Sequence, residues 1–300
     1  MNDISTSLGK ITLKSPILNA SGTFGTEYFN FFEQEVLGAY VTKTITLKPK
    51  EGNPSPRLYE TETGLLNAIG LQNPGLKSFL NNDLFELKDC LTIPLIVSFS
   101  GATEDEFIRV MEALELHSGI CGYEINISCP NVKNEGIAFG TDSDIVFNLV
   151  ERLAELTERE LIVKLSPNVA DIALIAQAAE AGGASALSLI NTLYGMAIDW
   201  ETGKSRLSTP VCGYSGMGIK PVALALTYQT TRAVKIPVIA MGGIHSWQDA
   251  LEFFYAGASA IAIGTANFSN PLTIPEIHHG LQTFLKQHNL NLRDIIGKVN

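Results

Sequence analysis

Short apolar runs alternate with longer amphipathic stretches along almost the whole chain. Several of these runs are apolar on both faces, as expected for parallel strands that helices cover. Between the runs, apolar residues recur with the spacing of about 3.6 residues that is typical of helices. The pattern predicts strands over residues 17–20, 39–44, 94–100, 122–128, 161–166, 186–191, 237–243 and 260–265. It predicts helices over residues 105–117, 142–159, 169–181, 220–233 and 246–256, the last opening on a capping box of Ser246 and Asp249.

The order of these elements predicts an α/β fold. Strands that alternate with helices, in a chain of 300 residues, favour a (β/α)8 TIM barrel with extended loops on its C-terminal face. A doubly wound open sheet is the alternative, but the GxGxxG fingerprint that usually follows its first strand is absent. No linker or internal repeat divides the chain, so we expect one domain over residues 1–300.

Two long segments interrupt the alternation. Residues 46–80 follow the second predicted strand, residues 192–218 follow the sixth, and both are rich in turn-forming residues. Each segment leaves the C-terminal end of its strand, the face on which barrels carry their chemistry. Long loops at that face usually form a lid or a substrate pocket, and we expect one here.

Every predicted strand ends on a polar residue or a glycine. The terminal residues are Ser21 and Gly22, Lys43 and Thr44, Ser98, Asn126 and Ser128, Lys164 and Ser166, Asn191 and Thr192, Gly242 and Gly243, and Gly264 and Thr265. One such residue would be an ordinary strand end, but a complete set suggests a shared site. The two lysines are the strongest signal, since a buried ammonium needs an anion or several acceptors. We expect Lys164 to be uncompensated in the core unless a bound ligand accepts it.

Glycines gather at the last two strand ends and in the GYSGMG stretch over 213–218. Loops after the seventh and eighth strands form the usual phosphate site of barrels, and glycine lets backbone N–H groups approach a ligand closely. A phosphate at one edge and two lysines in the barrel mouth suit flavin mononucleotide (FMN). One lysine can then lie at the N1/O2 edge, where reduced flavin carries negative charge.

Seven motifs in order give the chain a specific resemblance. They are LNAIGLQNPG, NISCPNV, VKLSPNV, NTLYGMAID, SGMGIKPVAL, IPVIAMGGI and AGASAIAIGTANF. With these motifs the chain resembles the class 1 dihydroorotate dehydrogenases from about Leu18 to Phe268, and the spacing of the motifs is similar to the class 1B catalytic subunit. The resemblance implies an FMN-containing barrel that oxidises (S)-dihydroorotate to orotate in the pyrimidine (UMP) pathway.

The same resemblance implies roles for individual residues. Cys129 would be the catalytic base, and a thiol is a plausible base because its unperturbed pKa of roughly 8.5 can be lowered by nearby cations. FMN would contact Ser21, Lys43, Thr44, Ser98, Asn126, Lys164, Ile190, Gly216, Gly242, Gly243, Gly264 and Thr265. The pyrimidine would be held by Lys43, Asn67, Ala68, Ile69, Gly70, Leu71, Asn126, Asn191 and Thr192.

Four positions depart from the family pattern. Ser98 stands where an asparagine facing the flavin is usual, and its shorter side chain puts that contact in doubt. Ile69 and Tyr194 vary in the two substrate-facing loops, and Met217 lies in a GYSGMG stretch that replaces a more usual GGLSGPA. None of these changes removes a catalytic group, so the expected activity stands.

Composition narrows the possible partners. The formal net charge is −10 and no basic run occurs, which argues against nucleic acid as a partner. The longest apolar runs are strand-sized, and the first residues lack a signal-peptide pattern, so we expect neither a membrane partner nor a secretory leader. Cysteines 90, 121, 129 and 212 are scattered without metal-ligand spacing. We therefore expect no metal site, and free thiols in a reducing cytoplasm.

Four functions compete at this point. The first is the class 1B catalytic subunit, a homodimer within a heterotetramer, whose partner subunit carries FAD and a two-iron, two-sulfur (2Fe-2S) cluster and passes electrons to NAD. The second is a stand-alone class 1A-like homodimer that uses fumarate. The third is a barrel that binds a phosphorylated ligand without turnover. A flavin-dependent tRNA reductase is the fourth, and the acidic charge disfavours it.

Overall fold

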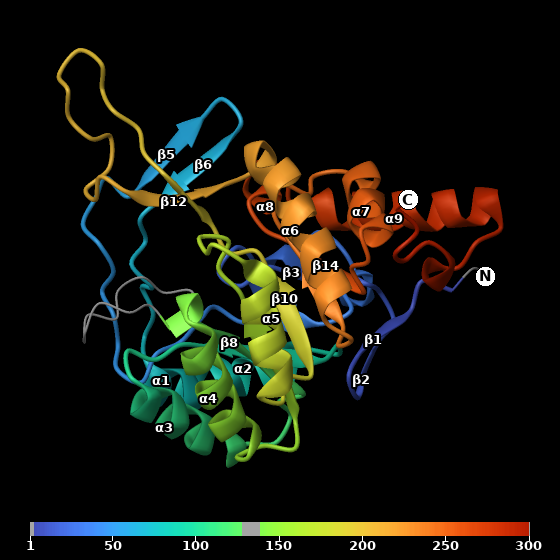
Figure 1. Ribbon diagram of the computed structural model, residues 1–300, viewed down its shortest axis with the longest axis horizontal. Coiled ribbons are helices and arrows are strands. Elements are labelled where there is room, and N and C mark those ends of the chain that lie inside the picture. Colours follow the sequence, from blue (N-terminus) through green and yellow to red (C-terminus); the bar gives the residue numbers. More distant parts are fainter. Residues whose placement is uncertain (1–2, 128–138, 300) are drawn as a thin grey trace.

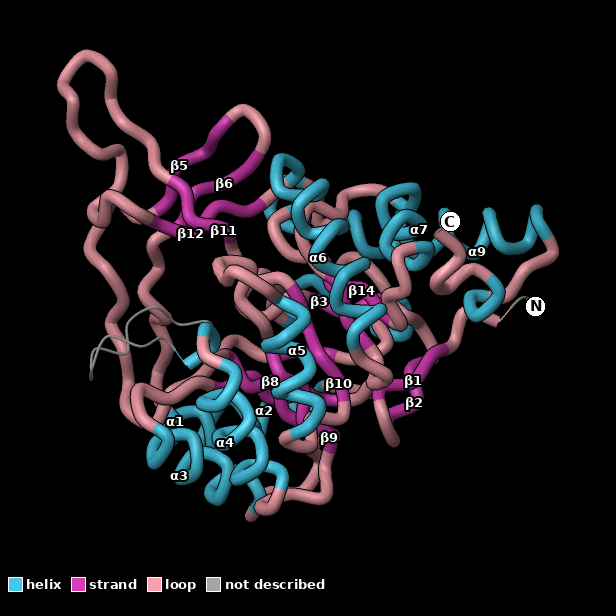
Figure 2. The backbone as a smooth tube through the Cα atoms, viewed as in Figure 1, coloured by secondary structure: helices cyan, strands magenta, loops and turns pink. Residues whose placement is uncertain are grey.

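The computed structural model of the chain describes residues 3–127 and 139–299. Its central feature is a sheet of eight parallel strands surrounded by helices (Figure 1, Figure 2). Seven of the eight strands lie wholly within predicted runs and β9 begins one residue before its run, so the predicted strands are confirmed. In sheet order the strands are β3 (Ile17–Asn19), β14 (Ala260–Ile263), β13 (Val238–Ala240), β10 (Ala186–Leu189), β9 (Glu160–Lys164), β8 (Gly122–Asn126), β7 (Leu95–Phe99) and β4 (Tyr40–Val41).

The first and last strands of this order, β3 and β4, also meet each other. Leu18 forms a parallel bridge with Ala39, and the backbone N–H of Gly38 donates to the carbonyl of Ile17 at 2.8 Å. The sheet therefore closes on itself. This closure confirms the predicted (β/α)8 barrel over the open-sheet alternative.

Apolar side chains fill the lower interior of the barrel. Strand residues alternate between the two faces of a sheet, and Ile96, Ile162 and Ile239 take the inward positions. They pack with Leu8 and Leu13, which come from a hairpin that the hydrophobic pattern did not predict. The hairpin consists of β1 (Thr6–Leu8) and β2 (Ile11–Leu13). It covers the N-terminal end of the barrel, so the chemistry is left to the C-terminal end.

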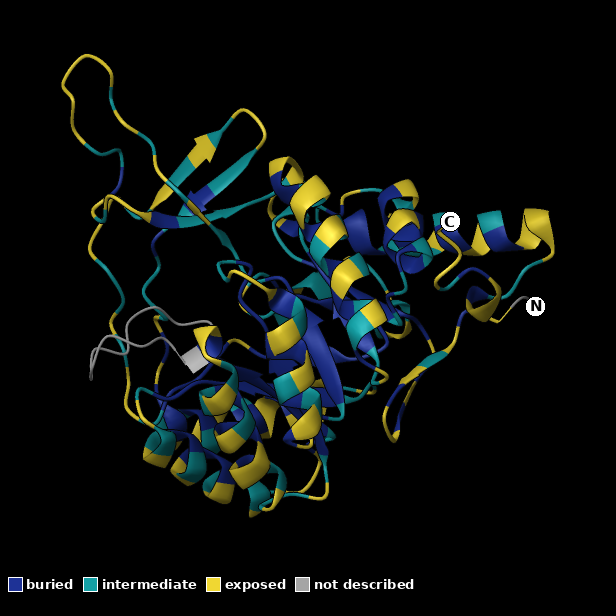
Figure 3. Ribbon diagram, in the orientation of Figure 1, coloured by how far each residue is buried: buried dark blue, intermediate teal, exposed yellow. Residues whose placement is uncertain are grey.

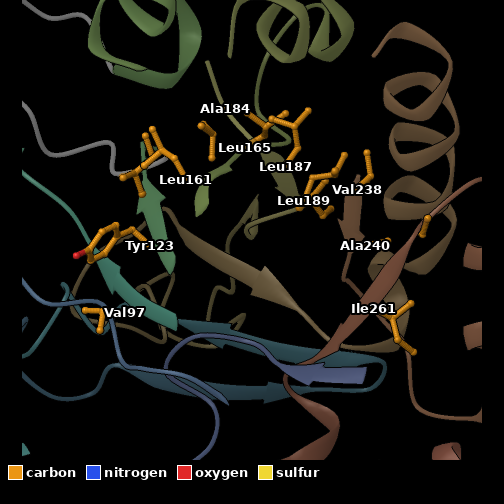
Figure 4. Close-up of a cluster of buried hydrophobic side chains, with 14 of the residues drawn as sticks. Val97, Tyr123, Leu161, Leu165, Ala184, Leu187, Leu189, Val238, Ala240 and Ile261 are labelled. Atoms are coloured by element: carbon orange, nitrogen blue, oxygen red, sulfur yellow. The ribbon is translucent and has the colours of Figure 1, made fainter. Parts of the chain in front are cut away.

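The outward positions of the strands form a second core with the helices. Tyr123, Leu161 and Leu187 are buried there, and part of this cluster is drawn in Figure 4. Figure 3 shows the helices with buried faces toward the strands and exposed faces outward, the arrangement expected of amphipathic helices. The main helices are α2 (Leu84–Cys90), α3 (Glu104–Glu115), α4 (Ser143–Ala154), α5 (Ile172–Ala181), α6 (Lys220–Ala233), α7 (Trp247–Tyr255) and α9 (Thr273–His288).

The helix predictions are confirmed for α3 to α7, with one clear error at a boundary. The predicted helix over 142–159 ends at Ala154, because the chain turns after Leu156 to enter β9 at Glu160. The predicted capping box of α7 is present, since the Ser246 hydroxyl accepts from the Asp249 backbone and the Asp249 carboxylate accepts from the Ser246 backbone. Within the described parts of the chain, no helix is both long and apolar enough to cross a membrane.

The two long segments join in a second sheet above the barrel (Figure 1). Its antiparallel strands follow the order β11 (Leu193–Gly195), β12 (Cys212–Ser215), β6 (Gly64–Asn67) and β5 (Leu58–Thr61). We call these four strands the cap sheet. The pairing of β12 with β6 links segments about 150 residues apart, with Gly213 opposite Asn67 and Ser215 opposite Leu65. The expected lid over the C-terminal face is therefore a shared sheet rather than two separate loops.

Candidate active site

A cavity of about 1440 Å³ lies between the C-terminal strand ends and the cap sheet. Its size and position are those of a site for a cofactor together with a small substrate. Most of the residues that the sequence singled out line it. These are Ser21, Lys43, Thr44, Asn67, Ala68, Ile69, Gly70, Leu71, Asn126, Lys164, Ile190, Asn191, Thr192, Gly216, Gly242, Gly243, Gly264 and Thr265.

Three of the singled-out residues are not among the lining residues: Ser98, Cys129 and Ser128, of which Ser128 lies outside the described residues. Ser98 is completely buried one layer below the cavity, where its hydroxyl lies 3.0 Å from the Thr44 hydroxyl and 3.1 Å from Oε1 of Glu124. It reaches the cavity through Thr44 rather than directly. Cys129 lies outside the described residues, so its role as base stays a prediction.

Two lysines lie in the floor of the cavity, and a buried carboxylate lies beneath them. Lys164 is 5% exposed, and its Nζ lies 3.4 Å from Oε1 of Glu124. The expectation that Lys164 would be uncompensated without a ligand is therefore wrong, because β8 supplies its counter-ion. Lys43 opens onto the cavity, but protein atoms crowd it on its other sides, and this desolvation together with the charge of Lys164 lowers its pKa. An anion placed near Lys43 would favour its charged form.

Hydroxyl groups extend this charged pair into a network across neighbouring strands. The Ser188 hydroxyl donates to Oε2 of Glu124 at 2.9 Å, and the Ser98 hydroxyl donates to Oε1. On the other side, the Thr44 hydroxyl lies 3.0 Å from the Ser21 hydroxyl. The layer directly beneath the cavity is thus polar and hydrogen-bonded, whereas the layers below it are apolar.

Glycines leave room along one edge of the cavity. Gly242 and Gly243 have positive φ angles of 125° and 79°, which disfavour other residues. A Cβ atom at Gly243 would lie 2.7 Å from Cβ of Lys220, so a side chain there would clash. Gly264 is different, because a Cβ atom built there would make only ordinary van der Waals contacts with its neighbours and would not clash. Since Gly264 lines the cavity, such a side chain would take up cavity space. Backbone N–H groups could approach a ligand closely along this edge, and the expected phosphate site there stays a prediction.

A buried aspartate anchors the glycine loop from behind. Asp249 Oδ1 accepts from Nζ of Lys220 at 2.6 Å, while Oδ2 accepts from the hydroxyl and backbone of Ser246 and from the backbone of His245. Burial alone would raise the pKa of Asp249, but the bonds from Lys220 and Ser246 outweigh it and lower the pKa. The interaction raises the pKa of Lys220 in turn. The loop before α7 is therefore held by charge-assisted hydrogen bonds.

Amide side chains form the opposite wall. Nδ2 of Asn191 lies 3.5 Å from Oδ1 of Asn126, and the Thr192 backbone donates to Oδ1 of Asn191 at 2.9 Å. Asn168, which sequence reasoning did not select, donates from Nδ2 to the Thr192 carbonyl at 3.0 Å and accepts from the Tyr194 backbone at 3.1 Å. Donors and acceptors alternate on this wall, which suits a planar ring with carbonyl and N–H groups.

The loop after β6 holds an unusual backbone. Gly70 and Leu71 follow one another with φ angles of 74° and 55°, and such a conformation is rare for a leucine. Asn73 stabilises this turn, because its Nδ2 donates to the Leu71 carbonyl at 2.7 Å. Asn53 stabilises the start of this loop in the same way, because its Nδ2 donates to the Ala68 carbonyl at 2.9 Å. Strain that neighbouring groups maintain in this way is typical of ligand-binding loops.

Fold and site together define a (β/α)8 barrel with a large polar cavity at its C-terminal face, the position at which barrel enzymes carry their chemistry. Residues 3–285 match the family model described as dihydroorotate dehydrogenase. The chain therefore belongs to the dihydroorotate dehydrogenase family, and it is an oxidoreductase.

Individual relatives extend this result over the full length. A protein of Thermoanaerobacter pseudethanolicus named "Dihydroorotate dehydrogenase B (NAD(+)), catalytic subunit" is 47% identical over 295 residues, which are 97% of each chain. A protein of the same name from Bacteroides fragilis is 46% identical over 300 residues, 99% of each chain. A third, from Geobacillus kaustophilus, is 45% identical and covers 99% of this chain and 96% of its own.

Proposed function

We propose that the chain is the catalytic subunit of a class 1B dihydroorotate dehydrogenase, which oxidises (S)-dihydroorotate to orotate in pyrimidine (UMP) biosynthesis. The observation that carries the proposal is one cavity with a glycine-lined edge, two lysines in its floor and a wall of amides. These are the groups that a flavin phosphate, a flavin ring and a pyrimidine would each need. The names of the three relatives support the same activity.

FMN suits the glycine-lined part of the cavity. Gly216, Gly242, Gly243 and Gly264 with Thr265 would hold the phosphate end, and Lys164 would face the pyrimidine edge of the flavin ring. When bound there, FMN supplies the hydride acceptor for the reaction. The hydroxyls of Ser21 and Thr44, which line the same cavity, would complete the contacts.

The substrate would lie against the amide wall. Asn67, Asn126 and Asn191 can donate to its carbonyl groups and accept from its N–H groups, and Lys43 can pair with its carboxylate. That pairing would also favour the charged form of Lys43, which desolvation disfavours. Ala68, Ile69, Gly70 and Leu71 with Thr192 would fix the ring from the cap side and exclude water.

Cys129 would remove the proton from C5 of dihydroorotate, while the hydride leaves C6. The support for this role is the NISCPN motif, in which Cys129 follows the cavity-lining Asn126 by three residues. A thiol serves as base once it is deprotonated, and positioned bases contribute about 10²- to 10⁴-fold to a rate. The flanking amides would orient the substrate so that the correct proton meets the thiolate.

Electrons would then leave through a partner subunit that carries FAD and a 2Fe-2S cluster, with NAD as the final acceptor. The words "catalytic subunit" and "NAD(+)" in the relatives' names support this assignment over a fumarate-linked homodimer. The sequence has no nicotinamide fingerprint of its own. We further propose a homodimer within a heterotetramer, located in the cytoplasm, and FMN bound within a single domain.

Anaerobic purification followed by mixing with (S)-dihydroorotate tests the proposal. The purified chain is expected to hold one FMN per chain. Dihydroorotate should bleach this flavin, and the reduced protein should transfer its electrons to dyes faster than to NAD. Addition of the partner subunit is expected to restore NAD reduction. FAD in place of FMN, or no bleaching by dihydroorotate, would contradict the activity. Rapid NAD reduction by the single chain would contradict only the partner assignment.

A further inference from the structure

Glu124 has no role in the activity as described so far, although it lies directly beneath the cavity floor, where it pairs with the cavity-lining Lys164. Its side chain is buried in the barrel interior, and the residue is 3% exposed. Tyr123 and Ile125 on either side of it pack outward in the helix-facing core, so Glu124 takes the inward position. Burying a carboxylate is costly unless it is paired and hydrogen-bonded, and a barrel can fill this position with an apolar residue at no such cost.

Three other strands of the barrel each contribute one polar group to Glu124. Ser98 from β7 and Ser188 from β10 donate hydrogen bonds to its two oxygens, and Lys164 from β9 lies 3.4 Å from Oε1. Lys43, which follows β4, is the other lysine that lines the cavity floor in the described part of the chain, and the charge of Lys164 contributes to lowering its pKa. Without Glu124 the floor would hold two cations; with it, the net charge of the three groups is reduced to one positive charge.

That difference matters for a flavin, because reduction places negative charge on its pyrimidine edge. Cations near this edge favour the reduced flavin and so retain electrons, whereas a carboxylate behind them has the opposite effect. The effect is large in a buried site, where charges are weakly screened. An enzyme that must hand its electrons to a second subunit gains from a flavin that releases them readily.

We propose that Glu124 is a positioning residue that fixes Lys164 beneath the flavin and, by offsetting its charge, lowers the reduction potential of the bound FMN. This inference rests on the proposed function, since it requires a flavin in the cavity. It assigns no bond-making step to Glu124. The carboxylate acts through Lys164 and through its charge.

The test is the reduction potential of bound FMN in Glu124→Gln, measured by equilibration with a reference dye. We expect the equilibrium to shift toward reduced flavin by at least about tenfold, or about 30 mV for a two-electron couple. Glu124→Asp, which keeps the charge, is expected to remain within about threefold of the wild type on the same scale. If Glu124 acted only in folding, the Gln variant would lose stability, but its bound FMN would keep the wild-type reduction potential.

Glu160 provides a matched control. It is a second buried carboxylate, 4% exposed, but it begins β9 at the opposite end of the barrel, where Oε1 accepts from the Lys10 backbone at 2.8 Å. Glu160→Gln removes the same charge far from the cavity floor, so the potential is expected to stay at the wild-type value. An equal shift in both Gln variants would show a general charge effect and overturn the proposal.

The remaining outcomes are also decisive. A Glu124→Gln variant that binds FMN with an unchanged potential overturns the proposal. Glu124→Met is a second neutral variant in case the Gln variant does not fold. If neither neutral variant folds while Glu124→Asp does, the carboxylate is structural and the proposal fails. Wild-type protein without flavin would instead refute the proposed function, because there would be no potential to measure.

Discussion

The side chain of Asn19 pairs with the backbone of Val41 in the way that a neighbouring strand would. Nδ2 of Asn19 donates to the Val41 carbonyl at 2.7 Å, and its Oδ1 accepts from the Val41 N–H at 2.9 Å. Both residues are buried at the seam where β3 meets the two-residue strand β4. The side chain thus satisfies both backbone groups of Val41 at the point where the barrel closes.

Asn19→Ala is therefore expected to destabilise the protein strongly. It removes two buried hydrogen bonds and leaves two backbone groups without partners, which costs about 2–4 kcal/mol in the free energy of unfolding. Chemical denaturation of the wild type and the variant measures the difference. Asn19→Asp keeps the size of the side chain but buries a carboxylate oxygen against the Val41 carbonyl, so this matched variant is expected to be at least as unstable as the alanine variant. Equal stability of all three would mean that the seam does not depend on this side chain.

Cys129→Ala is expected to retain FMN, because the assigned flavin contacts lie on other residues. Flavin reduction by dihydroorotate should fall by about 10²- to 10⁴-fold, the usual effect of a lost general base. Cys129→Ser should recover some rate only at high pH, since a hydroxyl loses its proton far less readily than a thiol. Stopped-flow bleaching across a pH series measures both effects.

Cys212 offers a control for that experiment. It also lines the cavity, but it is buried in β12 and burial raises the pKa of its thiol. Cys212→Ala is expected to keep the rate of flavin reduction within a few-fold of the wild type. The role of Cys129 as base would be refuted if its alanine variant behaved in the same way.

Asp249→Asn should weaken the protein in a pH-dependent manner. The pKa of Asp249 is lowered from its usual 3.8 by Lys220 and Ser246, against the effect of burial. Its stabilisation is therefore complete above pH 3.8 and is lost as the pH falls through the lower pKa of the folded state. At neutral pH the variant is expected to lose about 1.5–3 kcal/mol, and the difference should shrink in acid.

Denaturation at neutral and acidic pH checks this expectation. Asp171→Asn is the control, since Asp171 caps α5 through a bond to the Ala173 backbone at 2.9 Å and asparagine caps a helix about equally well. A loss that is the same at every pH would mean that the carboxylate charge of Asp249 is not responsible.

Asn168→Ala is expected to raise the KM for dihydroorotate by about tenfold, equivalent to about 1.4 kcal/mol, without loss of FMN. The variant frees the Thr192 carbonyl and the Tyr194 N–H, so the loop that carries Asn191 and Thr192 loses its support. Steady-state kinetics with a dye acceptor measures KM. Asn168→Asp keeps the acceptor for Tyr194 and is expected to be intermediate. An unchanged KM, or loss of flavin, would contradict this role.

Strand periodicity predicted the barrel because each strand is a short apolar run, and such runs are visible without knowledge of their neighbours. The cap sheet could not be found in this way. Its central pair joins Leu65–Asn67 to residues about 150 positions later, and the two segments carry no common pattern. The single-domain organisation stays a prediction.

The site was predicted in outline for a similar reason. Polar residues at the ends of parallel strands must meet, so Lys43, Asn126 and Lys164 could be grouped from sequence alone. Glu124 was missed because it lies inside a strand, although a charged residue between Tyr123 and Ile125 was a signal that it faces the interior. Asn168 was missed because it lies in a turn, where asparagine is common.

The cap sheet has a mechanical consequence. Asn67 ends β6 and Gly216 follows β12, and these two strands are hydrogen-bonded to each other. The paired strands β6 and β12 thus carry both an amide assigned to the pyrimidine and a glycine assigned to the flavin phosphate. A displacement at either end of this pair of strands is transmitted to the other. Occupation of the phosphate edge should therefore set the stiffness of the pyrimidine pocket, and flavin loading would be a prerequisite for tight binding of orotate.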